Sequence, residues 1–428
     1  MRVLLINPMP EGSLQPPHPV LPLGIACIAA IARDRGADVR VLYGTGTKTT
    51  LDTLLETWRP HCAGFQTFVN SMSICHELAE TIRRLAPNAF IVCGGVEASN
   101  HPDSALLSPA IDAVIPGEGE VIFGDLLDRL PDDAFTTAGL IYRDSNGTIR
   151  TNPGKSLYEN LDDLPPIPYD LFYSPNHAPV GHILTHRGCP FHCSHCPLRF
   201  RAGVPIRAHS AERIIQTITD LHRVYGVKHI EFYDENFTMD HDHVEAICHG
   251  IDSLPVSFSC TARISQITDK LCRRMADAGC RSIVFGIGTG VPRLQDVLGT
   301  HENLDHARQL IGRLPSMGIQ PIAVFSMGLP SETAADFKQT VDYAMSLEGC
   351  LIRFEPAAPL PGSPLYDKAS AGGRFTIRTW DQYVRPGQLV YIPAGRRHWS
   401  FYLDITRAKI RARLKRIRNH RGSGALSK

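Results

Sequence analysis

The sequence predicts an α/β fold built in two successive parts, an N-terminal doubly wound (Rossmann-like) domain over residues 1–135 and a partial (β/α)6 barrel over residues 177–370. Three observations predict this division. Short apolar runs alternate with helical patterns at the spacing of βαβ units in both parts. A hairpin and proline-rich linker over residues 136–176 interrupts the alternation. A small C-terminal extension over residues 371–428, which contains a basic helix, follows the last strand.

The first part opens on residues 2–7, an apolar run ended by Pro8, as expected of a central parallel strand. The sequence then predicts helices at about 21–35, 50–58, 70–85 and after 117–120, and strands at 38–43, 62–66, 89–93 and 113–115. Ligands of doubly wound sheets bind at the carboxyl ends of the strands, so the loops expected to matter are 8–18, 66–71, 94–101 and 116–120. No Gly-x-Gly-x-x-Gly follows the first strand and no P-loop motif occurs, which excludes the usual dinucleotide and nucleoside triphosphate sites.

The linker between the two parts has its own turn chemistry. Residues 139–150 are predicted to form a β-hairpin in which Asn146 and Gly147 supply two turn residues with positive φ. Residues 161–172, Leu-Asp-Asp-Leu-Pro-Pro-Ile-Pro-Tyr-Asp-Leu-Phe, form a proline-stiffened connector. We place the domain boundary near residue 175.

The second part begins with residues 182–185, a strand that leads into a loop rich in cysteine. Ser210 is the expected N-cap of the next helix, and Gly226 is its expected end. Further strands are predicted at 228–233, 256–260, 282–287, 320–327 and 351–355, with helical segments between them. Active sites on such barrels lie at the carboxyl ends of the strands.

Composition limits the functional classes. The chain has 428 residues, with 44 Lys and Arg against 43 Asp and Glu, so its global charge gives no reason to expect nucleic acid. Twelve cysteines occur, and outside residues 189–196 they stand singly in mostly apolar runs. No secretory leader is recognised and no apolar run reaches the length of a membrane span, since Pro22 and Gly24 break the stretch at 20–31. These features predict a cytoplasmic protein with reduced thiols.

The three cysteines Cys189, Cys193 and Cys196 lie in one loop bounded by glycine and proline. With three and two residues between them, their thiolates can turn toward one centre. Three thiolates suit a cubane [4Fe–4S] cluster that leaves one iron open. The alternative is a zinc loop completed by His192, His195 or a distant ligand, although zinc sites usually come as two separated pairs.

The Cys-x3-Cys-x2-Cys pattern, with His195 just before the last cysteine, resembles the motif of the radical S-adenosylmethionine (radical SAM) enzymes. The resemblance implies that SAM chelates the open iron and that one electron from the reduced cluster splits it to a 5′-deoxyadenosyl radical. It also assigns SAM contacts to the ends of the next strands, namely to His195, Asp234, Glu235, Asn236, Arg263 and Gly288. The acidic tip at 234–236 has an open alternative, a turn that caps the next helix. Arg263 also has one, a surface salt bridge.

Gly288 departs from the family pattern, because related enzymes commonly carry glutamate there, and this departure weakens the SAM assignment at that position. Residues 328–332, Gly-Leu-Pro-Ser-Glu, and residues 358–366 resemble later segments of the family, expected to contact adenine through backbone.

The first part resembles the cobalamin-binding domain that precedes many radical SAM domains, in the segments 21–26, 93–102 and 112–120. Glycines suit a flat corrin, which approaches backbone closely only where no Cβ intervenes. The resemblance assigns cobalamin contacts to Pro8, Gln66, Thr67, Phe68, Gly94, Gly95, Glu97, Gly117 and Glu118. Asp-x-His-x-x-Gly, which would supply a histidine to cobalt, is absent. A domain that keeps the fold without the cofactor is the alternative.

The resemblance implies a methyltransferase that uses a [4Fe–4S] cluster, SAM and methylcobalamin to methylate an unactivated carbon of a small metabolite, and we expect this metabolite to belong to natural-product or cofactor biosynthesis. A radical cyclase, dehydratase, epimerase or rearrangement enzyme without methyl transfer is the alternative, as is a non-enzymatic corrinoid carrier. We expect an electron donor such as flavodoxin or ferredoxin, and a monomer.

Between Arg407 and Arg421 the chain has eight Lys or Arg and no acid, with Ile410, Leu414 and Ile417 on one helical face. An acidic partner, RNA or a phosphate-bearing substrate is one interpretation of this helix, and the solvated face of a docked terminal helix is the other.

Overall fold

The computed structural model describes residues 1–10, 20–44, 47–154, 157–175, 180–198, 205–383 and 388–423, with side chains to residue 417 in the last range. The chain forms two compact units. The first unit consists of Met1–Ser174, Pro197–Arg207 and Thr379–Arg385, and the second consists of Pro175–Cys196, Ala208–Arg378 and Pro386–Lys428. The two short later segments of the first unit are not apparent from the linear pattern of strands and helices.

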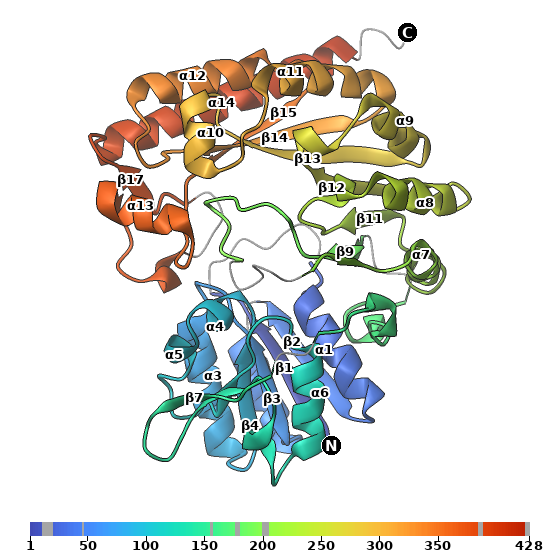
Figure 1. Ribbon diagram of the computed structural model, residues 1–428, viewed down its shortest axis with the longest axis vertical. Coiled ribbons are helices and arrows are strands. Elements are labelled where there is room, and N and C mark those ends of the chain that lie inside the picture. The colour runs from blue at the N-terminus through green and yellow to red at the C-terminus, as the bar shows by residue number, and fades with distance from the viewer. Residues whose placement is uncertain are drawn as a thin grey trace. The chain divides into compact units, whose positions relative to one another are not determined.

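The first unit is a doubly wound sheet between helices (Figure 1). Its elements are β1 (Arg2–Pro8), α1 (Leu23–Asp34), β2 (Asp38–Gly44), α2 (Thr47–Thr57), β3 (Cys62–Gln66), α3 (Met72–Leu85), β4 (Phe90–Gly94), α4 (Val96–Asn100), α5 (Pro102–Ala105), β5 (Ala113–Val114), α6 (Glu120–Arg129), β6 (Ile141–Arg143) and β7 (Ile149–Thr151). The strand order is β2-β1-β3-β4-β5-β6-β7, parallel from β2 to β5. The order in which successive strands join the sheet reverses between β1 and β3, and such sheets bind their ligands at this switch point.

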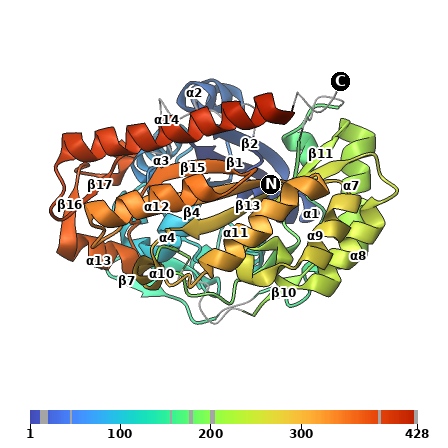
Figure 2. The same cartoon turned by 90° about the horizontal axis from the view of Figure 1, so that it is seen from above.

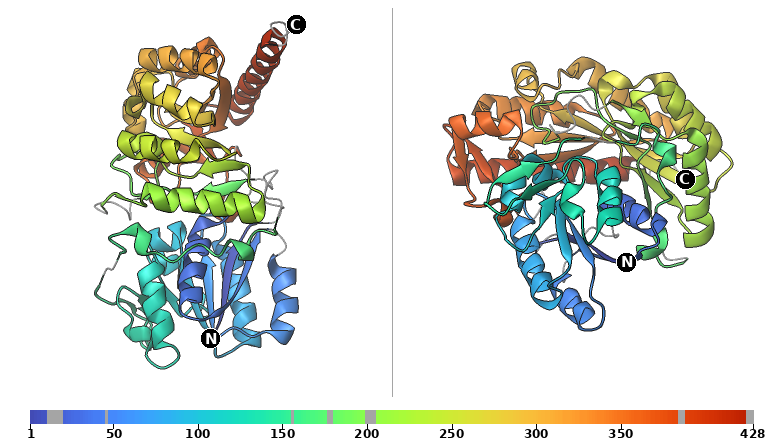
Figure 3. Two further views of the ribbon diagram at one scale, coloured as in Figure 1. Left: turned by 90° about the vertical axis from the view of Figure 1, so that its right-hand side faces the viewer. Right: turned by 60° about the horizontal axis from the view of Figure 1, so that its bottom comes forward.

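Helices bury both faces of this sheet, as Figure 3 shows from two further sides. Leu4 and Ile6 of β1 pack with α2 and α3, whereas Val3 and Leu5 pack with α1 and α6. Because alternate side chains of the strands enter two cores, the strands are apolar throughout rather than alternating.

The hairpin predicted for the linker forms, but its turn differs from the prediction. β6 and β7 pair antiparallel and extend the first sheet through β5. Gly147 has φ +81°, whereas Asn146 is not among the described residues with positive φ. Asp144 explains the difference, because its Oδ1 accepts hydrogen bonds from the amides of Asn146 and Thr148, both at 2.9 Å, and stabilises a wider loop. The expectation of two positive-φ residues was therefore wrong.

The second unit is a six-stranded parallel sheet with the order β15-β14-β13-β12-β11-β8, the partial barrel that the sequence predicts. Its elements are β8 (Gly181–Ile183), β9 (His186–Arg187), β10 (Arg207–Ala208), α7 (Ala211–Tyr225), β11 (His229–Phe232), α8 (His241–Ile251), β12 (Ser257–Ala262), α9 (Asp269–Asp277), β13 (Cys280–Gly288), α10 (Pro292–Leu298), α11 (Leu304–Arg313), β14 (Gln320–Met327), α12 (Ala334–Ser346) and β15 (Leu351–Pro356). Ser210 accepts a hydrogen bond from the amide of Arg213, and Gly226 ends α7 in the left-handed conformation. Both predicted helix signals are confirmed.

Four elements follow the barrel: α13 (Pro364–Gly372), β16 (Gly373–Phe375), β17 (Tyr391–Pro393) and α14 (His398–Ser423). β16 and β17 pair antiparallel. Seen from above, α14 runs beside α12 and β15 (Figure 2). Within the described ranges, no helix has both the length and the apolar character that crossing a membrane requires.

The two faces of the sheet of the second unit differ in polarity. Strand β12 alternates between buried and half-buried residues along its whole length. Ile230, Phe258 and Phe285 of neighbouring strands are buried on the face that the helices cover. The opposite, inner face carries a polar row that crosses the sheet by register, in the order His182, Glu231, Ser259, Ser282 and Gln320.

Candidate functional site

The cysteine loop follows β9 in the second unit. Cys189 is exposed, Cys193 and Cys196 are half-buried, and all three are free thiols. A turn closes between the last two, because the amide of Cys196 donates to the carbonyl of Cys193 at 3.1 Å. His195, predicted to contact SAM, lies exposed at this turn. The structure therefore presents the three sulfurs on one short irregular segment, as the sequence predicts.

Two distant elements hold this loop by its backbone. The amide of Ser194 donates to the carbonyl of Leu298 at 2.7 Å, and its carbonyl accepts from the amide of Leu365 at 2.9 Å. Gly299 ends α10 with φ +66°, and a Cβ there would lie 3.3 Å from the carbonyl oxygen of His192. A glycine is needed at this contact because both the conformation and the close approach disfavour a side chain. The cysteine loop is thus fixed from outside before any ligand is considered.

Arg263, at the end of β12, joins the cysteine loop to the interior. Its Nη1 lies 3.4 Å from Cys193 Sγ, its Nε donates to Glu302 Oε1 at 3.1 Å, and its Nη2 donates to the carbonyl of Thr300 at 2.5 Å. The guanidinium also lies 3.8 Å from the ring centre of Phe191. The ion pair is buried, with 15% and 3% of the two side chains exposed. The resemblance assigns a SAM contact to Arg263, whereas here the guanidinium positions the loop, and the SAM contact stays a prediction.

The acidic tip at 234–236 is also built into the protein. Asp234 Oδ1 accepts hydrogen bonds from the amides of Thr185 and His186 at 2.9 and 3.0 Å, and lies 3.0 Å from His186 Nδ1. Burial disfavours the charged imidazole, but the hydrogen bond and charge of Asp234 raise the pKa of His186 overall. Asn236 Oδ1 accepts from the amide of Arg263 at 3.1 Å. These bonds tie the start of the cysteine loop to β11 and β12.

Several buried polar atoms of this region find no hydrogen-bond partner within the described ranges. They are Asp234 Oδ2, Asn236 Nδ2, His186 Nε2 and Glu302 Oε2. Acceptors and a donor left over in this way suit a ligand with both an ammonium and a carboxylate group, as SAM has. The described residues contain no group of three His, Cys, Asp or Glu side chains placed to hold one metal ion. A cubane cluster places its three thiolates on three different irons, so it does not require such a group.

Gly288 ends β13 with φ +78°, and a Cβ there would lie 2.5 Å from Leu298 Cδ1. The glutamate common at this position in related enzymes would therefore not fit. Gln295 fixes the end of this strand, because its buried Nε2 donates to the carbonyls of Ile287 and Thr289, both at 2.8 Å. Sequence analysis missed Gln295, which has no motif around it. The role of Gly288 toward SAM stays a prediction.

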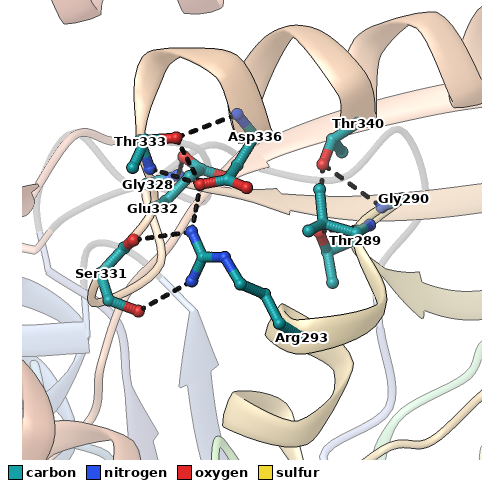
Figure 4. A network of polar contacts seen from close by, with 10 residues as sticks. Thr289, Gly290, Arg293, Gly328, Ser331, Glu332, Thr333, Asp336 and Thr340 are labelled. Carbon is teal, nitrogen blue, oxygen red and sulfur yellow. Dashed lines mark hydrogen bonds and ion pairs between the residues drawn. The ribbon is translucent and has the colours of Figure 1, made fainter.

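The Gly-Leu-Pro-Ser-Glu turn after β14 forms a polar network that Figure 4 shows from close by. Glu332 Oε2 accepts from the amide of Gly328 at 2.6 Å, while Arg293 donates to the carbonyl of Ser331 at 3.1 Å and pairs with Asp336. Ser331 has φ +66°, one of two described non-glycine residues with positive φ. The network fixes this strained turn at the carboxyl edge of the sheet.

Glu332 has the most perturbed carboxyl of this network. Its residue is 3% exposed, and Oε1 has no partner among the described residues. Burial raises the pKa of Glu332 to about 8, although the hydrogen bond from Gly328 and the charge of Arg396 act in the opposite direction. The side chain is therefore mostly neutral at pH 7.

In the first unit, the predicted cobalamin contacts meet at the carboxyl edge of β3 and β4. The amide and Oγ1 of Thr67 both donate to the carbonyl of Gly94 at 2.8 Å, and Thr67 Oγ1 accepts from the amide of Ala98 at 2.9 Å. Gly95 has φ +95°, and a Cβ there would lie 2.8 Å from the carbonyl oxygen of Thr67. The edge is thus a layer of backbone that only glycine permits.

This edge also has buried polar atoms to spare. Asn7 Oδ1, Gln66 Oε1 and His101 Nε2 lack hydrogen-bond partners among the described residues. Phe68 is 39% exposed and Pro8 is buried at the end of β1. Free acceptors and a bare glycine backbone suit the amide side chains and flat ring of a corrin, so the residues fit the group.

Three further predicted contacts lie beside this edge. Glu118 forms a buried ion pair with Arg207, in which Oε1 of Glu118 lies 2.5 Å from Nη2 of Arg207. Nη1 of Arg207 also donates a hydrogen bond to the carbonyl of Tyr158 at 2.7 Å. Burial raises the pKa of Glu97, and its effect is larger than that of the charge of His101, which lowers this pKa. Gly117 has φ +71° with open space around it, and the loop 8–18 lies largely outside the described residues. The cobalamin assignments stay predictions.

Two family models match the chain in the order in which its two units occur. The B12 binding domain matches residues 15–127, and the radical SAM superfamily matches residues 183–344. The chain therefore combines an N-terminal B12-binding domain with a radical SAM domain. These two domains imply a [4Fe–4S] cluster, SAM and cobalamin as its cofactors.

Particular relatives extend over most of the chain. An uncharacterized methyltransferase of Pyrococcus horikoshii is 29% identical over 398 residues, which cover 90% of this chain and 86% of the relative. The cytidylyl-2-hydroxyethylphosphonate methyltransferase of Streptomyces wedmorensis is 25% identical over 431 residues, covering 85% and 80%. The fold is similar to that of the radical SAM methyltransferase TsrM of Kitasatospora setae, solved with tryptophan and a SAM analogue, with a TM-score of 0.77, 19% identity and coverage of 95% and 88%.

Proposed function

We propose that the protein is a cobalamin-dependent radical SAM methyltransferase that methylates an unactivated carbon of a small molecule. The observation that carries methyl transfer is the near full-length similarity to two proteins named methyltransferases. When bound, the cluster would supply the electron that splits SAM, and cobalamin would carry the methyl group.

The chain's own residues then position the cysteine loop and SAM and exclude water from them, rather than acting as acids or bases. Arg263 holds Cys193 against the interior of the second unit, and Asp234 fixes His186, just before the cysteine loop, by accepting a hydrogen bond from its amide. The unpartnered atoms of Asp234 and Asn236 are acceptor and donor for the amino acid end of SAM. Hydrogen abstraction from carbon needs orientation and removal of water, for which a rigid loop and a closed turn are suited.

We place the substrate on the inner face of the second sheet, at the carboxyl ends of the strands. His182 is 2% exposed and stacks on Tyr233 with the ring centres 5.0 Å apart, whereas Tyr233 itself is 37% exposed. A small polar molecule can hydrogen-bond to such a face, whereas the helix-covered face is closed by apolar packing.

Product analysis tests the proposal. The anaerobically reconstituted protein is incubated with SAM, a chemical reductant and candidate small molecules. We expect both 5′-deoxyadenosine and S-adenosylhomocysteine, each dependent on the protein. Formation of 5′-deoxyadenosine alone would point to a cyclase, dehydratase, epimerase or rearrangement enzyme. Formation of neither, from protein that binds corrin but no iron, would point to a carrier.

A further inference from the structure

The terminal helix α14 is docked on the second unit by one of its faces. Phe401, Ile405 and Ala408 are 0%, 5% and 2% exposed. Further along, Lys415 Nζ donates to the carbonyl of Met345 at 2.8 Å and to that of Leu347. These contacts at spacings of three, four and seven residues fix the orientation of the helix from 401 to 415. The face that remains therefore points away from the unit in a defined direction.

That outer face has an apolar crest made of two groups of exposed side chains with Thr406 between them. The first group is Trp399 (74%), Tyr402 (49%) and Leu403 (48%), and the second is Ile410 (53%), Leu414 (51%) and Ile417 (43%). At 1.5 Å per residue, the crest from 399 to 417 is about 27 Å long. An exposed apolar surface of this length on a terminal helix marks an interaction site more often than chance exposure. In the left view of Figure 3 the carboxyl-terminal end of α14 projects beyond the helices beside it.

Basic side chains flank the crest on both sides. With about 100° of turn per residue, Arg407 and Arg411 fall on one flank and Lys409, Arg413 and Arg416 on the other. All five are exposed. The one acid of α14, Asp404, pairs with Arg396 at 2.6 Å and lies 3.8 Å from Arg407, while Arg411 lies 3.7 Å from Asp342 of α12. Both cations of the first flank thus have acidic neighbours, and the positive charge of the outer face is concentrated on the flank of Lys409, Arg413 and Arg416.

We propose that the crest and its basic flanks bind the anionic surface of a lipid bilayer, with α14 lying in the interfacial plane. A helix with an apolar stripe, aromatic residues and flanking Lys and Arg is the form that binds such surfaces. A flat surface meets both flanks at once, and the long basic side chains reach the headgroups while the crest enters the boundary below them. Trp399 and Tyr402 stand at one end, where amphipathic rings suit the interface.

Other occupants fit less well. A second copy of α14 would bring five like charges against five. Nucleic acid would satisfy the flanks but leave the apolar crest in water, because such interfaces are strongly polar. An acidic polypeptide would need a groove for the crest and acids on both rims. The bilayer goes beyond the proposed methyl transfer, since it assigns a surface outside the cysteine loop and the sheet.

Vesicle sedimentation of the reconstituted full-length protein tests the proposal. The probes are vesicles of phosphatidylcholine alone and vesicles in which about one third of the lipid is phosphatidylglycerol. Wild type should bind the anionic vesicles at least about tenfold better, and higher salt should weaken this binding. The charge variant Lys409→Glu/Arg413→Glu should lose at least about tenfold in partitioning. The crest variant Ile410→Ser/Leu414→Ser should lose several-fold.

A matched control reverses two exposed charges elsewhere, Arg223→Glu on α7 and Lys270→Glu on α9, and should bind as wild type does. Iron content and SAM cleavage should be unchanged in every variant, so failure here is distinct from failure of the proposed function. Absence of wild-type binding to anionic vesicles, or equal loss in the control, would overturn the proposal. Binding to poly-glutamate instead would assign the surface to an acidic polypeptide, and a dimer that the crest variant dissociates would assign it to a second copy.

Discussion

The two large sheets of the molecule differ in how their faces are used. In the first sheet, β3 and β4 bury four successive residues each, since helices cover both faces. In the second sheet, β12 alternates between buried and half-buried residues because helices cover only one face. A sheet that is closed on both faces leaves its carboxyl edge for a ligand, whereas a sheet open on one face also offers polar side chains.

This difference explains why the two candidate cofactor regions are built from different material. In the first unit the edge consists of glycine backbone around Thr67, and the spare polar atoms belong to single side chains such as Gln66. In the second unit side chains of several strands, above all Arg263 and Asp234, hold the cysteine loop. The comparison predicts that changes in one unit affect one cofactor and spare the other.

Removal of the three sulfurs should have the largest effect. The variant Cys189→Ala/Cys193→Ala/Cys196→Ala should bind essentially no iron and form no 5′-deoxyadenosine, because no cluster remains to reduce SAM. Corrin binding in the first unit should persist. Iron analysis and the visible spectrum of anaerobically purified protein measure both at once. The matched variant Cys272→Ser, a buried thiol outside the loop, should retain its iron.

Arg263→Ala should destabilise the second unit strongly. It leaves Glu302, whose side chain is 3% exposed, without its ion-pair partner, which costs about 3–5 kcal/mol. Thermal unfolding of the cluster-free protein measures this cost. The double variant Arg263→Ala/Glu302→Gln should recover much of it, while Arg223→Ala, which breaks an exposed pair, should change little. Equal melting temperatures for Arg263→Ala and wild type would contradict the positioning role.

Glu332 should make the second unit less stable as the pH rises. Its pKa moves from 4.5 to about 8 on folding, so between these values the folded protein holds a proton that the unfolded chain has released. Rising pH therefore favours unfolding in this window and costs about 2–4 kcal/mol by its upper end.

Glu332→Gln should abolish this component. The difference in unfolding free energy between the variant and wild type should grow from about pH 5 to about pH 8. Thermal melts at both pH values measure it, and Glu348→Gln, which removes an exposed carboxylate, should keep the wild-type dependence. A constant difference across the window would show that Glu332 is ionised throughout.

Gly95→Ala should have the opposite effect to the triple cysteine variant, because it should weaken corrin binding and leave the iron in place. The conformation φ +95°, ψ −175° is nearly restricted to glycine, and the new Cβ would press on the backbone of Thr67. We expect a loss of about 2–3 kcal/mol and weaker corrin binding, with iron retained. Gly147→Ala also has positive φ but meets open space, so it should cost less and leave corrin binding intact. If the Gly95→Ala and Gly147→Ala variants hold equal amounts of corrin, the glycine edge does not bind the cofactor.

Local patterns were enough to predict the alternating strands, the helix from Ser210 to Gly226 and the irregular loop that carries the three cysteines, because spacing and caps act within a few residues. The pair of Arg207 with Glu118 and that of Arg263 with Glu302 were out of reach, since 89 and 39 residues separate the partners. Nothing near Asn146 indicated that the side chain of Asp144 would set the turn or that the hairpin would join the first sheet.

Metal analysis of the Gly95→Ala and triple-cysteine variants beside wild type tests the central claim most directly. Wild type should hold about four iron atoms and one cobalt per chain, the cysteine variant cobalt without iron, and the glycine variant iron with less cobalt. Loss of both metals from either variant, or zinc in place of iron in the wild type, would contradict two separately built cofactor sites.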